Sequence, residues 1–156
     1  MIYLIKEVQR EELNDAFSLI WTTFSEFVAP DYTKEAVDNF KNNFIDSSDY
    51  REKFLNGQEI MFGAYDKKKL IGVLSVRGLE FISCVFVDKN YHRKGAARNL
   101  FAHVIPRLKE AGVEKIRLNS SPYAVPFYHS IGFKDFAPQQ VYQGILFTPM
   151  ELILQQ

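Results

Sequence analysis

Residues 87–100 read Val87-Asp88-Lys89-Asn90-Tyr91-His92-Arg93-Lys94-Gly95-Ala96-Ala97-Arg98-Asn99-Leu100. This stretch joins the end of an apolar, β-branched run to a short basic turn that contains a glycine, and the turn leads directly into an amphipathic helical pattern. The first backbone N–H groups of a helix have no intrahelical acceptor, and the helix dipole adds about half a positive charge at that end. The pattern predicts a site for an anion such as phosphate, although similar segments also occur in proteins that bind no phosphate there.

The side chains of this turn suit a close anionic ligand. Small residues leave room for a ligand against the backbone, and basic residues surround it with positive or polarisable groups. The small residues are Gly95, Ala96 and Ala97, and the basic residues are His92, Arg93, Lys94 and Arg98. We call residues 92–98 the cradle.

Strand and helix patterns flank the cradle on both sides. Before it, residues 59–65, 70–77 and 79–87 are apolar, β-branched and aromatic runs that predict a meander of antiparallel strands. After it, the helix is expected to continue to about residues 111–112, and residues 115–119 predict another strand.

Helical patterns occupy most of the first third of the chain. Residues 2–8 predict a strand, and residues 9–28 predict a helix because apolar residues recur at three- and four-residue steps. Thr33 is a candidate N-cap of a second helix that continues through Phe44. Residues 46–56 are polar and are compatible with a further short helix.

The last third predicts a short helix followed by strands. Ser121 is a candidate N-cap, and Pro122 suits the first helical position because its missing N–H costs nothing there. Residues 133–136 and 144–154 are strand-like. Pro149 lies in the second of these runs and suits an edge strand or a bulge.

The cradle resembles the acetyl-coenzyme A signature of the GCN5-related N-acetyltransferase (GNAT) family, in which Gln or Arg is followed by two residues, Gly, one residue, and Gly or Ala. Here the run is His92-Arg93-Lys94-Gly95-Ala96-Ala97, so a histidine, with an ordinary pKa of about 6.5, replaces the Gln or Arg. Residues 119–133 resemble a later family signature, in which a strand ending near an Asn leads to a helix bearing Phe-Tyr and then to a Gly-Phe turn.

The order of predicted elements is similar to the GNAT fold over essentially the whole chain. The resemblance implies an α/β (α+β) architecture with a mixed central sheet of about six or seven strands. An antiparallel meander is followed by the order β-α-β-α-β-β, with helices on both faces of the sheet.

The resemblance also implies how a coenzyme binds. In the family, the strand before the cradle diverges from its neighbour, and its free backbone groups pair with the pantetheine arm and the thioester carbonyl. By position these groups belong to Val85, Phe86 and Val87, and an N–H aimed at the thioester oxygen stabilises the oxyanion by about 2.7 to 4 kcal/mol. The pyrophosphate then lies over the amides of residues 93–98, and Asn119 contacts the pantetheine or acetyl region.

Tyr128 matches the tyrosine that protonates the departing thiolate in many family members. A phenol with an ordinary pKa of about 10 can give a proton to a thiolate as it forms. The alternative interpretation is a core aromatic beside Phe127 on the same helix.

The sequence contains no evident general base. Some family members use a glutamate six residues ahead of the motif's valine, and Phe81 stands at that position. Glu80 is adjacent, but neighbouring side chains of a regular strand point to opposite faces. Proton removal through water, or by Glu26 or Asp31, stays open. Cys84 has no flanking His and acid, and we interpret it as a small buried hydrophobic residue.

Length and composition limit the class of protein. With 156 residues and 47% hydrophobic content, we expect a single N-acetyltransferase domain over residues 1–156. Nineteen basic and 19 acidic residues argue against partners that are nucleic acids or membrane surfaces. One cysteine argues against a disulfide or a multi-cysteine metal site, and we expect no metal. The chain has no long apolar run and no signal-peptide pattern, so we expect a cytoplasmic protein, either a monomer or a homodimer.

The acceptor site is less defined than the cradle. Residues 1–54 carry eleven acidic and six basic residues, so this acidic third either faces a cationic acceptor or simply forms solvated helix faces. Four aromatic residues near the junction of the first two helices line either an acceptor pocket or the core. They are Trp21, Phe24, Phe27 and Tyr32.

These patterns leave three hypotheses for function. The first is an acetyltransferase that moves the acetyl group of acetyl-coenzyme A directly to a primary amine of a small molecule or peptide, with no covalent acetyl-enzyme. The second is a catalytically weak or inactive coenzyme A-binding regulatory or interaction module, which the missing base favours. The third is a nucleotide-phosphate binder, which the lack of a Gly-Lys-Ser/Thr ending disfavours.

Overall fold

A computed structural model describes residues 3–155, which form a mixed sheet in the order β1-β2-β3-β4-β5-β8-β6, with β7 paired to β8. The strands are β1 (Leu4–Glu7), β2 (Glu59–Asp66), β3 (Lys69–Arg77), β4 (Phe81–Val87), β5 (Lys115–Ser120), β6 (Lys134–Asp135), β7 (Gln140–Tyr142) and β8 (Ile145–Ile153). Pairing is antiparallel except between β4 and β5. The meander and the mixed sheet are confirmed, whereas the predicted strand start at Ile2 lies outside the described residues.

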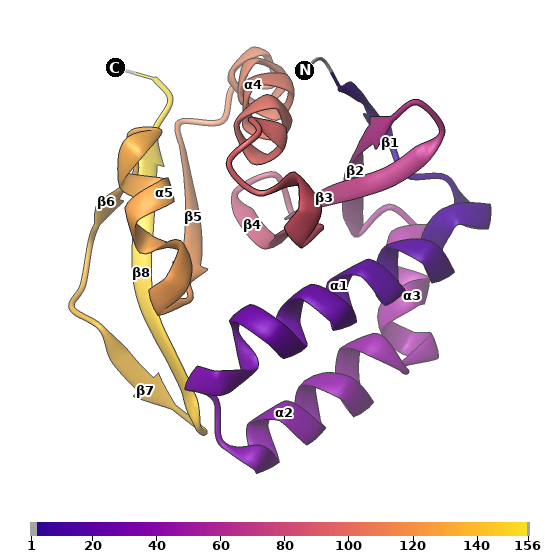
Figure 1. Cartoon of the computed structure of the whole chain (residues 1–156). Coiled ribbons are helices and arrows are strands. Elements are labelled where there is room, and N and C mark those ends of the chain that lie inside the picture. Colours follow the sequence, from indigo (N-terminus) through magenta and orange to yellow (C-terminus); the bar gives the residue numbers. More distant parts are fainter. Residues whose placement is uncertain (1–2, 156) are drawn as a thin grey trace.

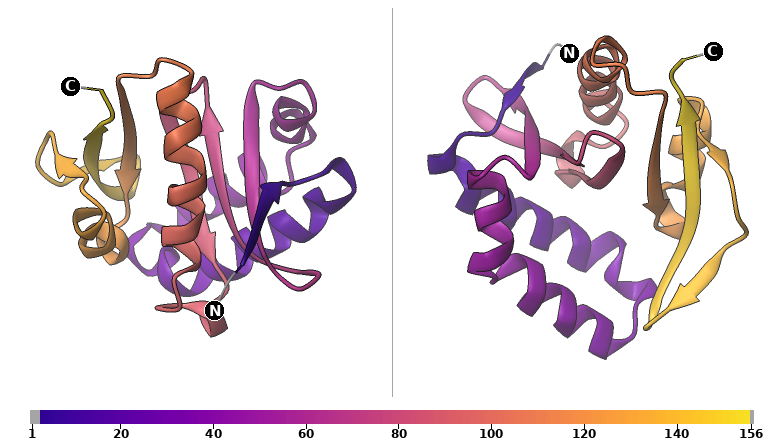
Figure 2. Two further views of the ribbon diagram at one scale, coloured as in Figure 1. Left: turned by 90° about the horizontal axis from the view of Figure 1, so that it is seen from above. Right: turned by 180° about the vertical axis from the view of Figure 1, so that it is seen from behind.

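Helices cover both faces of this sheet (Figures 1 and 2). They are α1 (Leu13–Phe27), α2 (Lys34–Phe40), α3 (Ser48–Leu55), α4 (Ala96–Glu110) and α5 (Val125–Ser130). A π-helical turn, Lys41–Ile45, continues α2, and 3₁₀ turns lie at Arg10–Glu12, Ala29–Asp31, Lys89–Tyr91 and Pro122–Ala124. The Thr33 side chain accepts a hydrogen bond from the Ala36 N–H, so the predicted N-cap of the second helix is confirmed.

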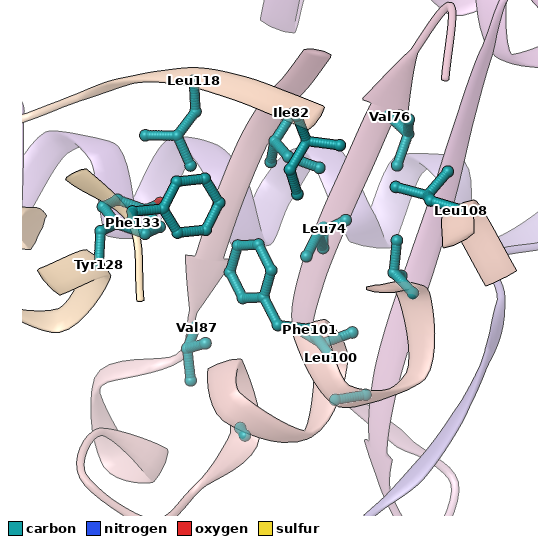
Figure 3. Close-up of a cluster of buried hydrophobic side chains, with 14 of the residues drawn as sticks. Leu74, Val76, Ile82, Val87, Leu100, Phe101, Leu108, Leu118, Tyr128 and Phe133 are labelled. Carbon is teal, nitrogen blue, oxygen red and sulfur yellow. The ribbon is translucent and has the colours of Figure 1, made fainter. Parts of the chain in front are cut away.

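The apolar core has two parts, one on each face of the sheet. On one face, Leu100 and Phe101 of α4 pack against Leu74 of β3, as Figure 3 shows. On the other face, Phe17 of α1 packs in a cluster with Val73. Neighbouring residues of β3 therefore serve opposite cores, as the two-residue period of a strand requires.

The sheet divides where β4 and β5 separate. These parallel strands pair only at Phe81 and Arg117, while β5 pairs with β8 over six residues from Lys115 to Ser120. The edge of β4 after Phe81 therefore has no partner on β5. This separation leaves backbone N–H and C=O groups of β4 available to a ligand.

One local prediction in the last third is wrong, and another is confirmed only in part. Pro149 lies in an interior strand, because β8 pairs with β5 at Asn119 and the Phe136 N–H donates to the Pro149 carbonyl from the other side. Ser121 is the N-cap residue of a 3₁₀ turn and Pro122 begins that turn, as predicted, but the Ser121 side chain makes no capping hydrogen bond. The α5 helix begins only at Val125.

Candidate active site

The cradle turns sharply before α4. Gly95, immediately before the helix, has a φ of +86°, and Arg93 has a φ of +61°. Glycine adopts such left-handed backbone readily, but the conformation costs another residue on the order of 1–3 kcal/mol, and residues held in it cluster at ligand sites. No atom lies within 4 Å of a Cβ built on Gly95, so the space above the first turn of α4 is open to a ligand.

A cavity of about 560 Å³, the cradle cavity, lies between the cradle, the end of β4, α1 and α5. Most of the predicted coenzyme-binding residues line it, namely Val85, Phe86, Val87, His92, Arg93, Gly95, Ala96, Ala97 and Arg98. Lys94 is exposed outside the cavity, with its ammonium 5.9 Å from the ring centroid of Tyr91. Asn119 does not line it either. Residues far apart in sequence complete the wall, including Phe27, Tyr123 and Pro126.

His92 fastens the cradle to its surroundings. Its Nε2–H donates to the Val87 carbonyl at 2.7 Å, and its Nδ1 accepts from the Tyr123 hydroxyl at 3.3 Å. The Phe27 ring lies 4.7 Å from the imidazole, centroid to centroid. A histidine at this position therefore ties the end of β4 to the turn before α5, a structural role that the sequence did not indicate.

A second cavity of about 410 Å³, the aromatic cavity, lies along β4 from Phe81 to Phe86. Helices α1, α2 and α3, strand β4 and the β7–β8 hairpin supply its wall. Aromatic residues are the largest group in this wall, namely Phe17, Phe24, Tyr32, Phe40, Phe44, Tyr50, Phe54, Phe81, Phe86, Tyr128, Tyr142 and Phe147. Asn119 also lines this cavity.

The two cavities share part of their wall. The shared residues are Val28, Val85, Phe86, Ser121, Ala124 and Tyr128. Tyr128 is buried, and its ring is held edge-on by Phe101 and Phe133, at centroid distances of 6.0 and 5.6 Å (Figure 3). Burial raises the pKa of the Tyr128 phenol above its ordinary value, with a smaller contribution from nearby Cys84. The phenol therefore stays protonated in neutral and mildly alkaline solution.

A protein-family model described as an acetyltransferase (GNAT) domain matches residues 28–154 of the chain. The chain belongs to the GNAT acetyltransferase family. This match confirms the family that the cradle and the second signature indicate.

Solved structures of GNAT proteins share the fold over nearly the whole chain. A GCN5-related N-acetyltransferase from Rhodopseudomonas palustris is 16% identical, with a TM-score of 0.85, over 99% of this chain and 97% of that one. The PaiA N-acetyltransferase from Thermoplasma acidophilum, solved with coenzyme A, is 18% identical, with a TM-score of 0.80, over 98% and 99%. The ribosomal-protein-S18-alanine N-acetyltransferase from Escherichia coli is 19% identical, with a TM-score of 0.66, over 99% and 96%. A search of the curated proteins finds no match.

A buried carboxylate lies behind the aromatic cavity of this GNAT protein. Glu59 Oε2 accepts hydrogen bonds from the Tyr50 hydroxyl at 3.1 Å and the Ser83 hydroxyl at 3.0 Å, and Oε1 accepts from Arg77 Nε at 3.0 Å. Ser83 is at a β-bulge, because Ser75 pairs with Cys84 while Val76 pairs with Ile82. Glu59 therefore joins α3 and three strands at the polar end of the cavity, and nothing in the sequence pattern indicated it.

Replacing Glu59 by alanine is expected to lower the free energy of unfolding by roughly 2–4 kcal/mol, because two hydroxyls and a guanidinium lose a charged partner. Arg77 is half-exposed and can turn to solvent, which keeps the loss below that of a fully buried pair. Urea denaturation measures the change. The matched control is Glu7→Ala on the exposed edge of β1, which should shift stability by at most about 0.5 kcal/mol. Equal effects of the two substitutions would contradict a structural role for the cluster.

Cys84 has the properties of an inert thiol. Burial raises the pKa of the thiol to about 12, although the hydrogen bond with Ser75 Oγ at 3.0 Å opposes the shift. The thiolate is the nucleophile, so at pH 8 we expect a disulfide reagent to label the native protein roughly 1,000-fold more slowly than the chain unfolded in urea. Rapid labelling in native buffer would show that Cys84 ionises in the folded GNAT protein and would overturn this view.

The acids proposed as general bases lie outside the walls of both cavities. Neither Glu26 nor Asp31 lines either cavity, and Glu26 pairs with Lys89 at 3.5 Å. Phe81 lies in the wall of the aromatic cavity. Among the described residues that line this cavity there is no carboxylate, so the acidic first third does not present its charge there.

The aromatic residues near the first two helices divide between the two cavities. Phe24 and Tyr32 line the aromatic cavity, and Phe27 lines the cradle cavity. Trp21 lines neither and stacks on Phe24 at a centroid distance of 5.9 Å. Among residues 3–155, no helix is long and apolar enough to cross a membrane, and no group of three or more His, Cys, Asp or Glu side chains is arranged to hold a metal.

Proposed function

We propose that this GNAT protein is an N-acetyltransferase that moves an acetyl group from acetyl-coenzyme A directly to a primary amine, with both substrates bound at once. The observation that carries the proposal is the shared wall of the two cavities at Val85, Phe86 and Tyr128. A coenzyme in one cavity and an amine in the other would meet at this wall.

The cradle fits a coenzyme A pyrophosphate, and acetyl-coenzyme A as co-substrate follows from membership of the family. The free first-turn amides of α4, the open space over Gly95 and the guanidinium groups of Arg93 and Arg98 suit two phosphates. The edge of β4 at Val85 and Phe86, which has no partner on β5, suits the amide groups of the pantetheine arm, whereas the Val87 carbonyl already accepts from His92.

The residues of the shared wall have separate tasks in this proposal. Acetyl-coenzyme A, when bound, supplies an acetyl group on a thioester. A backbone N–H of Val85 or Phe86 donates to the acetyl oxygen, where negative charge develops. The amine nitrogen forms its bond to the acetyl carbon, and the carbon–sulfur bond breaks with its electron pair going to sulfur. Tyr128 gives its phenolic proton to the sulfur, the acetylated nitrogen releases its extra proton to water, and solvent then reprotonates the Tyr128 phenolate. The neutral Cys84 thiol argues against a covalent acetyl-enzyme.

Two measurements test this proposal. Calorimetry with coenzyme A, ATP and NAD should give the tightest binding with coenzyme A, and a preference for either nucleotide would overturn the assignment. A thiol-release assay with acetyl-coenzyme A and a panel of amines should give turnover with at least one amine. Coenzyme A binding without release on the whole panel would favour the regulatory module instead.

A further inference from the structure

We infer that the acceptor is a compact monoamine on an apolar, aromatic body, bound in the aromatic cavity. This inference rests on the proposed function and extends it from a primary amine in general to one class of amine. A volume of about 410 Å³ lies in the lower part of the range for small-molecule sites, which is about 300–1,000 Å³.

The rings of the wall form a continuous apolar surface. Phe24 stacks on Phe40 at a centroid distance of 4.0 Å and an interplanar angle of 17°, and it meets Tyr32 edge-on at 5.0 Å. Phe44 continues the row at 5.4 Å from Phe40. Aromatic walls favour flat ligands that offer ring faces and edges at these same spacings.

The charge of the wall selects against polycations. Arg77 is the one charged residue among the described residues that line the cavity, and its Nε is held by Glu59. A diamine or polyamine would have to bring a second ammonium into a wall that offers no carboxylate of its own, since the Glu59 carboxylate behind the wall is already paired with Arg77. A second, unpaired ammonium in such a site weakens the binding of a diamine, and a monoamine carries no such second charge.

Contacts at the cavity rim favour a compact acceptor over a polypeptide. The Thr33 N–H donates to the Gly144 carbonyl at 3.0 Å, and Tyr32 bridges to Ile145 of β8. A Cβ at Gly144 would clash with Thr33 Oγ1, so the close approach needs glycine. These contacts join the helical side of the wall to the β7–β8 hairpin, so the two sides of the wall meet at this point of the rim.

An apolar cavity also prepares the amine for attack. Desolvation disfavours the charged form of an amine and lowers its pKa, so that the neutral nucleophile is more populated than in water. The hydroxyls of Tyr50 and Ser83 at the polar end are already committed to Glu59. Burial of the amine thus provides a means of deprotonation that needs no carboxylate in the wall.

Thiol release and calorimetry with coenzyme A-loaded protein test the inference with three probes, 2-phenylethylamine, 1,4-diaminobutane and the peptide Phe-Gly-Gly. We expect 2-phenylethylamine to have a kcat/KM at least about tenfold above the other two, and to bind more tightly, because charge and size exclude them. Preference for the diamine or the peptide would overturn this inference while leaving the proposed function intact. Absence of both coenzyme binding and thiol release would defeat the proposed function itself.

A charge placed in the wall gives a second test. Phe44 is 37% exposed, so Phe44→Glu should fold while adding a carboxylate to the cavity. We expect this variant to lose roughly tenfold in 2-phenylethylamine affinity and to gain affinity for 1,4-diaminobutane. The matched control is Phe136→Glu, at an exposed aromatic residue outside both cavities, which should change neither affinity. Identical behaviour of the two variants would overturn the assignment of the aromatic cavity to the acceptor.

Discussion

Tyr128→Phe is expected to lower kcat by about 100-fold or more, the scale of a general acid, while coenzyme A affinity stays within about twofold. Tyr128 belongs to the wall shared by the cradle and aromatic cavities, and T-shaped contacts with Phe101 and Phe133 fix its ring. Phenylalanine keeps those contacts and removes only the proton donor. Steady-state thiol release and calorimetry with coenzyme A measure the two quantities.

The matched control is Tyr3→Phe. The Tyr3 hydroxyl is buried outside both cavities without a hydrogen-bond partner among the described residues, so its removal should leave kcat unchanged. The pH profile adds a further check. Burial raises the pKa of Tyr128, so the protonated phenol persists as the pH rises. At pH values below 10, kcat should therefore not decrease through loss of this proton. Wild-type turnover in Tyr128→Phe would rule out the acid role.

Local sequence patterns predicted most elements because each pattern depends on neighbours in the chain. The cradle illustrates this: the left-handed glycine, the small residues after it and the start of α4 are all decided within about six residues. Thr33 and the strand run of β3 are similar cases, since capping and alternation act over short distances.

Features that depend on distant partners were not predictable. The three residues of β7 form a strand only because β8 lies beside them, and the interior position of Pro149 depends on partners from β5 and from Phe136. The residues that line the aromatic cavity are spread over the sequence from Phe17 to Phe147, so no single segment of the sequence reveals this cavity. In the sequence, Glu59 is only the polar first residue of a predicted strand. Its structural role depends on the hydroxyls of Tyr50 in α3 and Ser83 in β4, which bind it only in the folded protein.

Gly95→Asp is expected to weaken coenzyme A binding at least about tenfold while lowering the free energy of unfolding of the free protein by no more than about 1–2 kcal/mol. Aspartate and asparagine adopt left-handed backbone more readily than other non-glycine residues, so the φ of +86° at Gly95 can be kept. The new carboxylate would lie at the N-terminus of α4, in the space where we place the pyrophosphate. A negative charge there favours the helix by about 0.3–1 kcal/mol but repels a phosphate.

Gly95→Asn isolates the charge from the added volume. Because the two side chains have nearly the same shape and backbone preference, the ratio of their dissociation constants for coenzyme A reports electrostatics alone. This ratio should shrink when salt is raised from about 0.1 M to 1 M, since the Debye length falls from about 10 Å to 3 Å. Calorimetry at both salt concentrations measures the ratio, and thermal unfolding without ligand measures stability. Equal coenzyme affinities of the two variants at low salt would show that the pyrophosphate does not lie at the first turn of α4. That result would also contradict the proposed orientation of the coenzyme, with its thioester toward Tyr128.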